Sequence, residues 1–362
     1  MVAGPLTGSP DSVEVASTLA AIEPVDPAWI ERARARQKAL TKPEGSLGRL
    51  EEVANRVAAI QQTLAPSLGK ARIILFAADH GVAAEGVSAY PSSVTAEMVR
   101  NFLGGGAAIC AIARANGIDL RVVDVGVASD LPESDGLVRL PIARGTGNIV
   151  REPAMSPESA AAAIAVGIRM VREAVSDGCG VVGIGEMGIG NTTTAAAVTV
   201  ALTGHASSEV VGRGTGVDNR TLRKKVQVVA RAAAFHRLPI ADPIQILSRV
   251  GGFEIAAMCG VSIGAAATRT PVMVDGFIAT AAAALACRMS ASVGDYLFAA
   301  HRSPEAGHGI LLDLIGHSPL LDLGMRLGEG TGAALGIAML RSGVAAFTEM
   351  ATFAEAGVSE AG

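Results

Sequence analysis

The chain alternates short runs of β-branched and apolar residues with longer alanine-rich segments, and this alternation constrains its fold more than any other feature. The short runs are typical of buried strands, whereas apolar residues at i, i+3 and i+4 form one face of a helix. Strands that alternate with helices are typical of a parallel sheet whose connections cross its faces. We therefore expect an α/β fold with helices packed on a parallel sheet.

The same patterns give approximate bounds for the elements. Strands are predicted at Arg72–Ala77, Leu120–Val125, Gly180–Ile184 and Pro271–Val274, with weaker candidates at Val210 and near Leu297. Helices are predicted at Trp29–Leu40, Leu47–Leu64, Ser93–Ala115, Pro157–Ser176, Thr192–Leu202, Asn219–Phe235, Phe253–Ala267, Gly276–Met289 and Gly332–Met350. Met1–Ala20 carries acidic residues and two prolines, and we expect it to be a loose tail.

Composition excludes several classes of protein. With 362 residues, of which 50% are hydrophobic, the chain can bury a large core in one domain or a few. Its net charge of -4 argues against the extended cationic surface that binds nucleic acid. The first residues lack the basic region of a secretory signal, and the longest apolar run, Phe277–Cys287, is shorter than the roughly 20 residues that span a bilayer. We expect a soluble, cytoplasmic protein that binds no membrane.

The cysteines and histidines do not predict a metal site. The four cysteines are widely spaced without a C-x-x-C pair, which favours reduced, buried thiols over a disulfide or zinc site: Cys110, Cys179, Cys259 and Cys287. His301 and His308 flank a turn that holds Pro304 and Gly307, so they lack the i, i+4 spacing of helical metal ligands. We therefore predict no metal at these residues.

Polar loops follow several of the predicted strands. In parallel sheets, ligands bind at the carboxyl ends of the strands, where the connecting loops gather. Asp79 follows the first strand, Glu186 follows the third, and Asp275 follows the fourth. A further acid, Glu329, stands in the turn Gly328–Gly332, whose three glycines suggest a backbone arranged around a ligand. We expect these four carboxylates to surround one cleft, with Glu329 as the first candidate for chemistry.

The loop after the third strand permits two interpretations. Gly183-x-Gly185-x-x-Gly188 matches the dinucleotide fingerprint, but Glu186 would face a pyrophosphate and no clear strand-end acid follows at the expected distance. In the alternative, Gly188 and Gly190 admit a phosphate to the helix start at Asn191-Thr192, where free N–H groups and the helix dipole attract anions. We favour this phosphate cradle, and an ordinary strand–turn–helix with a polar cap stays open.

Several longer motifs occur together in one order between about residues 41 and 340. They are Thr41–Glu51 (TKPEGSLGRLE), Ala78–Val82 (ADHGV), Gly188–Thr193 (GIGNTT), Gly251–Glu254 (GGFE), Val274–Phe277 (VDGF) and Met325–Ala333 (MRLGEGTGA). In this combination the chain resembles the nicotinate-nucleotide–dimethylbenzimidazole phosphoribosyltransferase family. A set of long motifs in a fixed order is far more specific than any single glycine pattern.

The resemblance implies transfer of the phosphoribosyl group of nicotinate mononucleotide to 5,6-dimethylbenzimidazole. The products are α-ribazole 5'-phosphate and nicotinate, in assembly of the lower ligand of cobalamin. The attacking benzimidazole must lose its N–H proton, which suits a carboxylate base, and the resemblance assigns that role to Glu329. The pyridinium leaving group departs neutral at nitrogen, so we expect no catalytic metal and no cofactor, with inversion at the anomeric carbon.

The resemblance also implies further site residues. Glu186 would orient the acceptor or assist proton transfer, or else it is a helix-entry acid. Tyr90, Met98 and Leu327 would line the apolar acceptor slot, although the first two are also compatible with a structural role. Asp275 would contact the ribose or cap a strand end, and Lys225 would be a site lysine or a solvated helix charge.

For the fold, the resemblance implies a doubly wound, Rossmann-like parallel sheet with a smaller helical domain built from both chain ends. Residues 1–65 and 331–362 would form the small domain, residues 66–330 the large α/β catalytic domain, and two chains a homodimer. Two other classes of function remain open from the sequence. One is a nicotinamide-dependent oxidoreductase that uses the Gly183 loop, and the other is a nucleotide-binding protein without catalysis.

Overall fold

The computed structural model describes residues 9–214 and 216–359. Within these ranges, the strands form one parallel sheet of order β3-β2-β1-β4-β5-β6. Their bounds are β1 Lys70–Ala78, β2 Asp119–Gly126, β3 Leu137–Arg139, β4 Cys179–Met187, β5 Val272–Val274 and β6 Leu297–Ala299. The order reverses between β1 and β4, which is the switch point of a doubly wound sheet. The predicted Rossmann-like α/β fold is confirmed.

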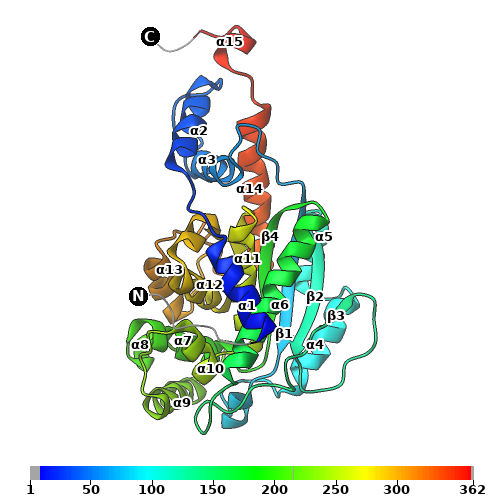
Figure 1. Cartoon of the computed structure of the whole chain (residues 1–362), viewed down its shortest axis with the longest axis vertical. Coiled ribbons are helices and arrows are strands. Elements are labelled where there is room, and N and C mark those ends of the chain that lie inside the picture. The colour runs from blue at the N-terminus through cyan, green and yellow to red at the C-terminus, as the bar shows by residue number, and fades with distance from the viewer. Residues whose placement is uncertain (1–8, 215, 360–362) are drawn as a thin grey trace.

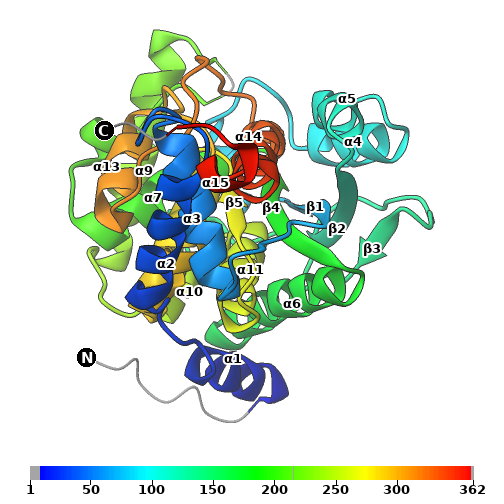
Figure 2. The same cartoon turned by 90° about the horizontal axis from the view of Figure 1, so that it is seen from above.

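Helices cover both faces of the sheet (Figures 1 and 2). On one face lie α6 (Pro157–Ser176), α11 (Phe253–Ala267) and α12 (Phe277–Met289), and on the other lie α4 (Ser93–Leu103), α5 (Ala108–Ala115) and α14 (Thr331–Glu349). The other helices of the described chain are α1 Pro10–Ala20, α2 Pro27–Ala39, α3 Arg49–Gln61, η1 Gly81–Glu85, α7 Asn191–Thr203, α8 Ser207–Val210, α9 Asn219–His236, α10 Pro243–Val250, η2 Ala291–Tyr296, α13 Ala306–Ile315 and α15 Phe353–Ala356.

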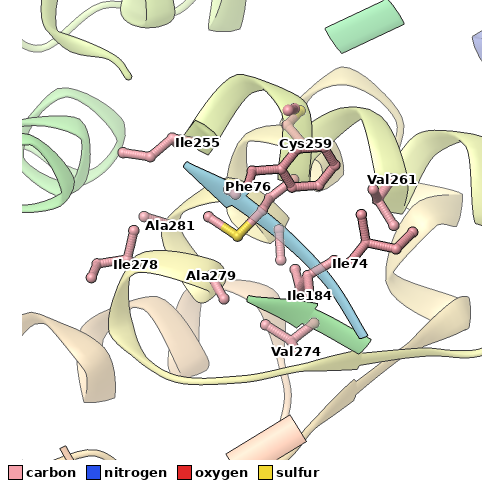
Figure 3. Close-up of a cluster of buried hydrophobic side chains, with 14 of the residues drawn as sticks. Ile74, Phe76, Ile184, Ile255, Cys259, Val261, Val274, Ile278, Ala279 and Ala281 are labelled. Carbon is pink, nitrogen blue, oxygen red and sulfur yellow. The ribbon is translucent and has the colours of Figure 1, made fainter. Parts of the chain in front are cut away.

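The central position of β1 in the sheet explains why its sequence is a continuous run of apolar residues. It pairs with β2 on one side and β4 on the other, so Ile73 lies beside both Leu120 and Gly183. Helices cover both of its faces, and a strand buried on both faces is hydrophobic at successive positions rather than alternate ones. Figure 3 shows Ile74 and Phe76 of β1 reaching toward α11 in the main core.

Glycines bring α6 and α11 into backbone contact. A β-carbon on Gly260 of α11 would lie 1.9 Å from the carbonyl oxygen of Ile164, and one on Gly167 of α6 would lie 1.9 Å from the carbonyl oxygen of Ala257. Both distances are far below contact distance. These glycines are therefore required for the close packing that places α11 against the sheet.

Helices from near both ends of the chain, α2, α3 and the end of α14, meet at the top of Figure 1. Here α2 and α3 pack with the C-terminal part of α14 around a small separate cluster of Ala33, Ala54, Ala58 and Phe347. Arg36 ties α2 to this end of α14, because its Nε donates to the carbonyl oxygen of Phe347 at 2.9 Å. By contrast, α1 packs on α6 and α11. Residues 9–65 thus contact both the small cluster around Phe347 and the helices that cover the large sheet.

Several local predictions were wrong. The segment to Ala20 is no loose tail in its described part, because Ser9 caps α1 by accepting from the Ser12 amide; residues 1–8 lie outside the described ranges. Val210 ends the short helix α8 instead of forming a strand, since the Glu209 side chain accepts from the amide of Ala206 and starts a helical turn. The helix predicted over Ser93–Ala115 is interrupted at Gly104–Gly106, where Gly105 has a positive φ.

All four cysteines are free thiols. Cys110, Cys179 and Cys259 are buried, and Cys287 is half-buried beside the same core. Burial raises the pKa of the Cys259 thiol, so it stays protonated and behaves as a small apolar side chain. The predicted burial is confirmed for three of the four thiols.

One helix of the described chain, α14, is long and apolar enough by length and composition to span a membrane. More than half of it is buried in the protein, where it packs against α3, β4 and β5. Those are the surroundings of a core helix.

The contact between α6 and α11 predicts a position-specific glycine effect. Gly260→Ala should lower the free energy of unfolding by at least about 2 kcal/mol, because the two helix backbones must separate. Gly309→Ala is the matched control, since no atom lies within 4 Å of a β-carbon at this position in α13, and it should be neutral or stabilising by about 0.5–1 kcal/mol. Denaturant unfolding measures both. Equal effects of the two substitutions would contradict the packing argument.

Candidate active site

A cavity of about 660 Å³ opens at the carboxyl ends of β4, β5 and β6. Each strand or the loop after it supplies polar lining: Glu186 from β4, Asp275 after β5, and His301 after β6. The opposite wall comes from α4 and from the turn before α14, where Glu329 lies. This is the edge at which a doubly wound sheet binds its ligands.

The Glu329 turn has an unusual backbone. Gly328, Glu329 and Gly330 have φ values of 85°, 63° and 84°, so three successive residues are left-handed. Glycine accepts this conformation freely, but for Glu329 it costs about 1–2 kcal/mol. The turn also lies against β4 with no room for a side chain, because a β-carbon on Gly185 would be 2.6 Å from the carbonyl oxygen of Glu329. Such strain is typical of functional turns held by their surroundings.

Asp275 holds this turn through two hydrogen bonds. The amide of Gly330 donates to Asp275 Oδ2 at 3.1 Å, and the amide of Ala333 donates to Asp275 Oδ1 at 2.9 Å. The carboxylate therefore caps the start of α14 from a different strand, at the positive end of the helix dipole. The fully buried position raises the pKa of Asp275, and the neighbouring His301 and the backbone amides oppose this rise.

Glu329 is buried and lines the cavity. Its pKa is raised to about 7. Burial is the main cause, the amide of Ile109 opposes the rise, and the charge of Asp275 adds to it. Its Oε2 has no hydrogen-bond partner among the described residues. A carboxylate with a pKa near neutral and a free oxygen is suited to accept a proton from a ligand.

Glu186 lies next to the same turn. Its Oε2 accepts from Asn191 Nδ2, and its Oε1 lies where a β-carbon on Gly328 would be 2.4 Å away. Burial raises the pKa of Glu186 to about 8, and the charges of Asp275 and Glu254 contribute to the rise. Burial thus raises the pKa of both glutamates toward neutrality or above, the range in which a carboxyl group can exchange a proton with a ligand.

Part of the cavity lining is apolar and includes Tyr90, Val94, Met98, Met187 and Leu327. Tyr90 and Leu327 lie at the rim, with 54% and 56% of their surface exposed. These side chains have the character of a slot for a flat aromatic group.

Another part of the cavity lining is polar and includes the start of α7. Asn191 and Thr192, in the first turn of α7, belong to it. Lys225 is only 1% exposed, and its Nζ donates to Thr192 Oγ1 at 3.0 Å. Burial lowers the pKa of Lys225 to about 8, and Glu305 opposes this shift. A helix N-terminus with a buried lysine beside it suits an anion such as phosphate.

The structure brings most of the predicted site residues together. Nine of them line the cavity: Tyr90, Met98, Glu186, Gly188, Asn191, Thr192, Asp275, Leu327 and Glu329. Gly190 and Lys225 lie behind this lining, where Gly190 begins α7 and Lys225 contacts Thr192. The alternative of a solvated charge at Lys225 was wrong, because tertiary packing buries the face of α9 on which it lies.

One prediction about the loops was wrong, and the disfavoured dinucleotide fingerprint proves to be a packing pattern. Asp79 does not line the cavity, because its Oδ2 instead accepts from the amide of Ala128 at 2.8 Å and ties β1 to the loop after β2. Gly183 and Gly185, the first two glycines of the dinucleotide fingerprint, lie inside β4 and not in a turn. Because they have no side chain, they leave room for Ile73 and for the Glu329 turn. Packing therefore explains why glycine occupies these two positions.

Sequence reasoning missed part of the lining. His301, Ser303, Glu305 and Arg326 all line the cavity. The first three follow β6, and a strand-end argument applied to the weak strand near Leu297 would have found them. His308 uses both ring nitrogens within the protein, Nδ1 with the amide of Ser303 and Nε2 with the hydroxyl of Thr280. Among residues 9–214 and 216–359, no three His, Cys, Asp or Glu side chains form a group suited to a metal ion.

Comparison with known proteins gives one consistent result. A family described as phosphoribosyltransferase matches residues 22–358. The nicotinate-nucleotide–dimethylbenzimidazole phosphoribosyltransferase of Geobacter sulfurreducens is 51% identical over 342 residues, which cover 94% of this chain and 97% of that protein. The enzyme of the same name from Chloroflexus aggregans is 50% identical over 95% of this chain and 97% of that protein.

The crystal structure of CobT from Thermus thermophilus is 48% identical in sequence and superposes with a TM-score of 0.89. The match covers 92% of this chain and all of that one. Family, relatives and fold agree over nearly the whole length. The chain belongs to the nicotinate-nucleotide–dimethylbenzimidazole phosphoribosyltransferase family.

Proposed function

We propose that this protein transfers the phosphoribosyl group of nicotinate mononucleotide to 5,6-dimethylbenzimidazole or a related base. The products are α-ribazole 5'-phosphate and nicotinate, as in assembly of the lower ligand of cobalamin. The observation that carries the proposal is Glu329, a buried carboxylate with a free oxygen and a raised pKa in a cavity whose lining has an apolar slot and an anion-binding part. The names of the relatives support the same substrates.

The chemistry follows from the apolar and polar parts of the cavity lining. The phosphate of the nucleotide binds at the start of α7, near Lys225, and the flat acceptor occupies the slot between Met98 and Leu327. The ribose then lies between these two groups, where it contacts Asp275. This arrangement brings the anomeric carbon between leaving group and acceptor, and displacement from the opposite side inverts its configuration.

Glu329 acts as the general base in this proposal. The acceptor nitrogen forms a bond to the anomeric carbon as the bond from that carbon to the pyridinium nitrogen breaks. Glu329 takes the azole N–H proton, and nicotinate departs neutral at nitrogen without needing a proton. Glu186, largely protonated at neutral pH, can donate a hydrogen bond within the site and so orient the acceptor.

The surface around the cavity supports a homodimer. Tyr90 and Leu327 at its rim and the nearby chain at Leu323 expose much of their apolar surface, and a second copy would cover such side chains. The small helical domain from both chain ends is supported by the separate cluster around Phe347. A cytoplasmic location is compatible with the free thiols.

The substrates predict a simple assay. Purified protein mixed with nicotinate mononucleotide and dimethylbenzimidazole, in the presence of a chelator, should release nicotinate and form α-ribazole 5'-phosphate in equal amounts. Omitting the acceptor should abolish release. Folded protein that releases no nicotinate would contradict the proposal. Hydride transfer with NAD would favour an oxidoreductase, and binding without turnover a nucleotide-binding protein.

Removal of the proposed base should affect turnover more than binding. Glu329→Gln keeps the size of the side chain but cannot accept the proton, so kcat should fall by about 10²–10⁴-fold with nucleotide affinity retained. Glu97→Gln is the control, because Glu97 is an exposed acid of the neighbouring α4 that lies outside the cavity lining. Product formation and calorimetric binding measure the two effects. An unchanged kcat in Glu329→Gln would remove this residue as the base.

The two glutamates predict a narrow pH profile. Glu329 must be ionised, so kcat/KM should rise as the pH passes through about 7; Glu186 must stay protonated, so the rate should fall as the pH passes through about 8. In Glu186→Gln the alkaline limb should disappear and the acid limb should remain. Comparing both proteins on the same acceptor cancels the titration of the acceptor itself. An alkaline limb that persists in Glu186→Gln would exclude this role.

A further inference from the structure

His301 is a buried side chain in the cavity wall to which the proposed reaction gives no task. It follows β6 and lies 2% exposed, with Nε2 3.8 Å from Asp275 Oδ1. Its Nδ1 has no hydrogen-bond partner among the described residues. Burial of an imidazole with one unsatisfied nitrogen costs free energy, so its position calls for a physical reason.

The position of the ring supplies that reason. A β-carbon on Gly332 would lie 2.1 Å from His301 Cδ2, and one on Gly276 would lie 3.2 Å from His301 Nε2. The imidazole is therefore in direct contact with the backbone on both sides. It lies between the first turn of α14 and the segment that carries Asp275.

Asp275 contacts the same turn through hydrogen bonds. Its two oxygens accept from Gly330 and Ala333, on either side of Gly332. His301 also lowers the pKa of Asp275, which favours the ionised carboxylate that these amides need. The two side chains thus hold a turn whose left-handed Glu329 would otherwise relax.

We propose that Asp275 and His301 are positioning residues for Glu329, Asp275 by hydrogen bonding to the turn and His301 by packing against Gly332 and Asp275. The inference rests on the proposed function, because it takes Glu329 as the base. Neither residue needs to touch the reacting atoms. Their effect is to keep the Glu329 carboxylate aimed at the acceptor slot.

The charges around Glu329 make this role measurable. The charge of Asp275, after β5, and the amide of Ile109, in α5, act on its carboxylate. Glu186 of β4, His301 after β6 and Arg326 before the turn line the same cavity. Asp275 raises the pKa of Glu329. Removal of this charge must therefore lower that pKa, which a loss of stability alone would not do.

The test uses the full chain with the substrates named above. In Asp275→Asn, kcat should fall about 100-fold, KM for the nucleotide should rise only a few-fold from the weakened ribose contact, and the acid limb of kcat/KM should move to lower pH. In His301→Asn, kcat should fall about tenfold. His236→Asn is the matched control, because His236 is buried like His301 but lies outside the cavity lining. Its Nε2 bonds to the carbonyl oxygen of Ile149. This variant should keep wild-type kcat and pH dependence.

Three results would overturn the inference. One is a wild-type kcat in both variants, and another is a loss in His236→Asn as large as in His301→Asn. The third is a defect of Asp275→Asn confined to KM with an unmoved acid limb, which would make Asp275 a ribose contact only. If Asp275→Asn fails to fold, Gly332→Ala decides, because its β-carbon displaces both side chains and should also lower kcat; a normal kcat there contradicts the inference. An inactive wild-type protein would instead reject the proposed function.

Discussion

The close contact between β4 and the Glu329 turn at Gly185 is the constraint on which the rest of the site depends. Two backbones from distant parts of the sequence touch there without a side chain between them. This contact brings Glu186, which stands just before the last β4 residue, Met187, beside Glu329. A larger residue at Gly185 would separate the two acids, so a packing requirement inside the sheet sets the distance between two groups proposed to share the chemistry.

That closeness has an electrostatic cost. Glu186, Asp275 and Glu329 are three buried carboxyl groups in one cavity, and each raises the free energy of ionising a neighbour. The start of α14 offsets part of this cost, because its amides stabilise a negative charge on Asp275. Burial is the largest cause of the raised pKa of both glutamates, and the charge of Asp275 adds to it. A carboxylate held at the start of a helix thus reinforces the effect of burial on its two neighbours.

Sequence patterns predicted the long elements well, because burial on both faces gives β1 and β4 an unmistakable apolar run. They missed β3, whose three residues Leu137–Arg139 are too few to show a period. Site residues were predicted where an acidic residue lies among glycines, as Glu329 does. His301 was missed because the three-residue strand β6 that it follows gives only a weak pattern. The burial of Lys225 was missed because it depends on the tertiary packing of α9. Local patterns do not contain that information.

The helix α14 joins the site to the chain ends. In its first turn the amide of Ala333 donates to Asp275, its middle packs on β4 and β5, and its last turns form the small cluster with α2 and α3 through Phe347. A helix is stiff over this length, because backbone hydrogen bonds join each residue to the residue four positions away. Displacement of α2 and α3 would therefore tilt the axis that starts at the Glu329 turn. The segments before the sheet thus contact the helix that carries this turn, although none of the described cavity lining comes from them.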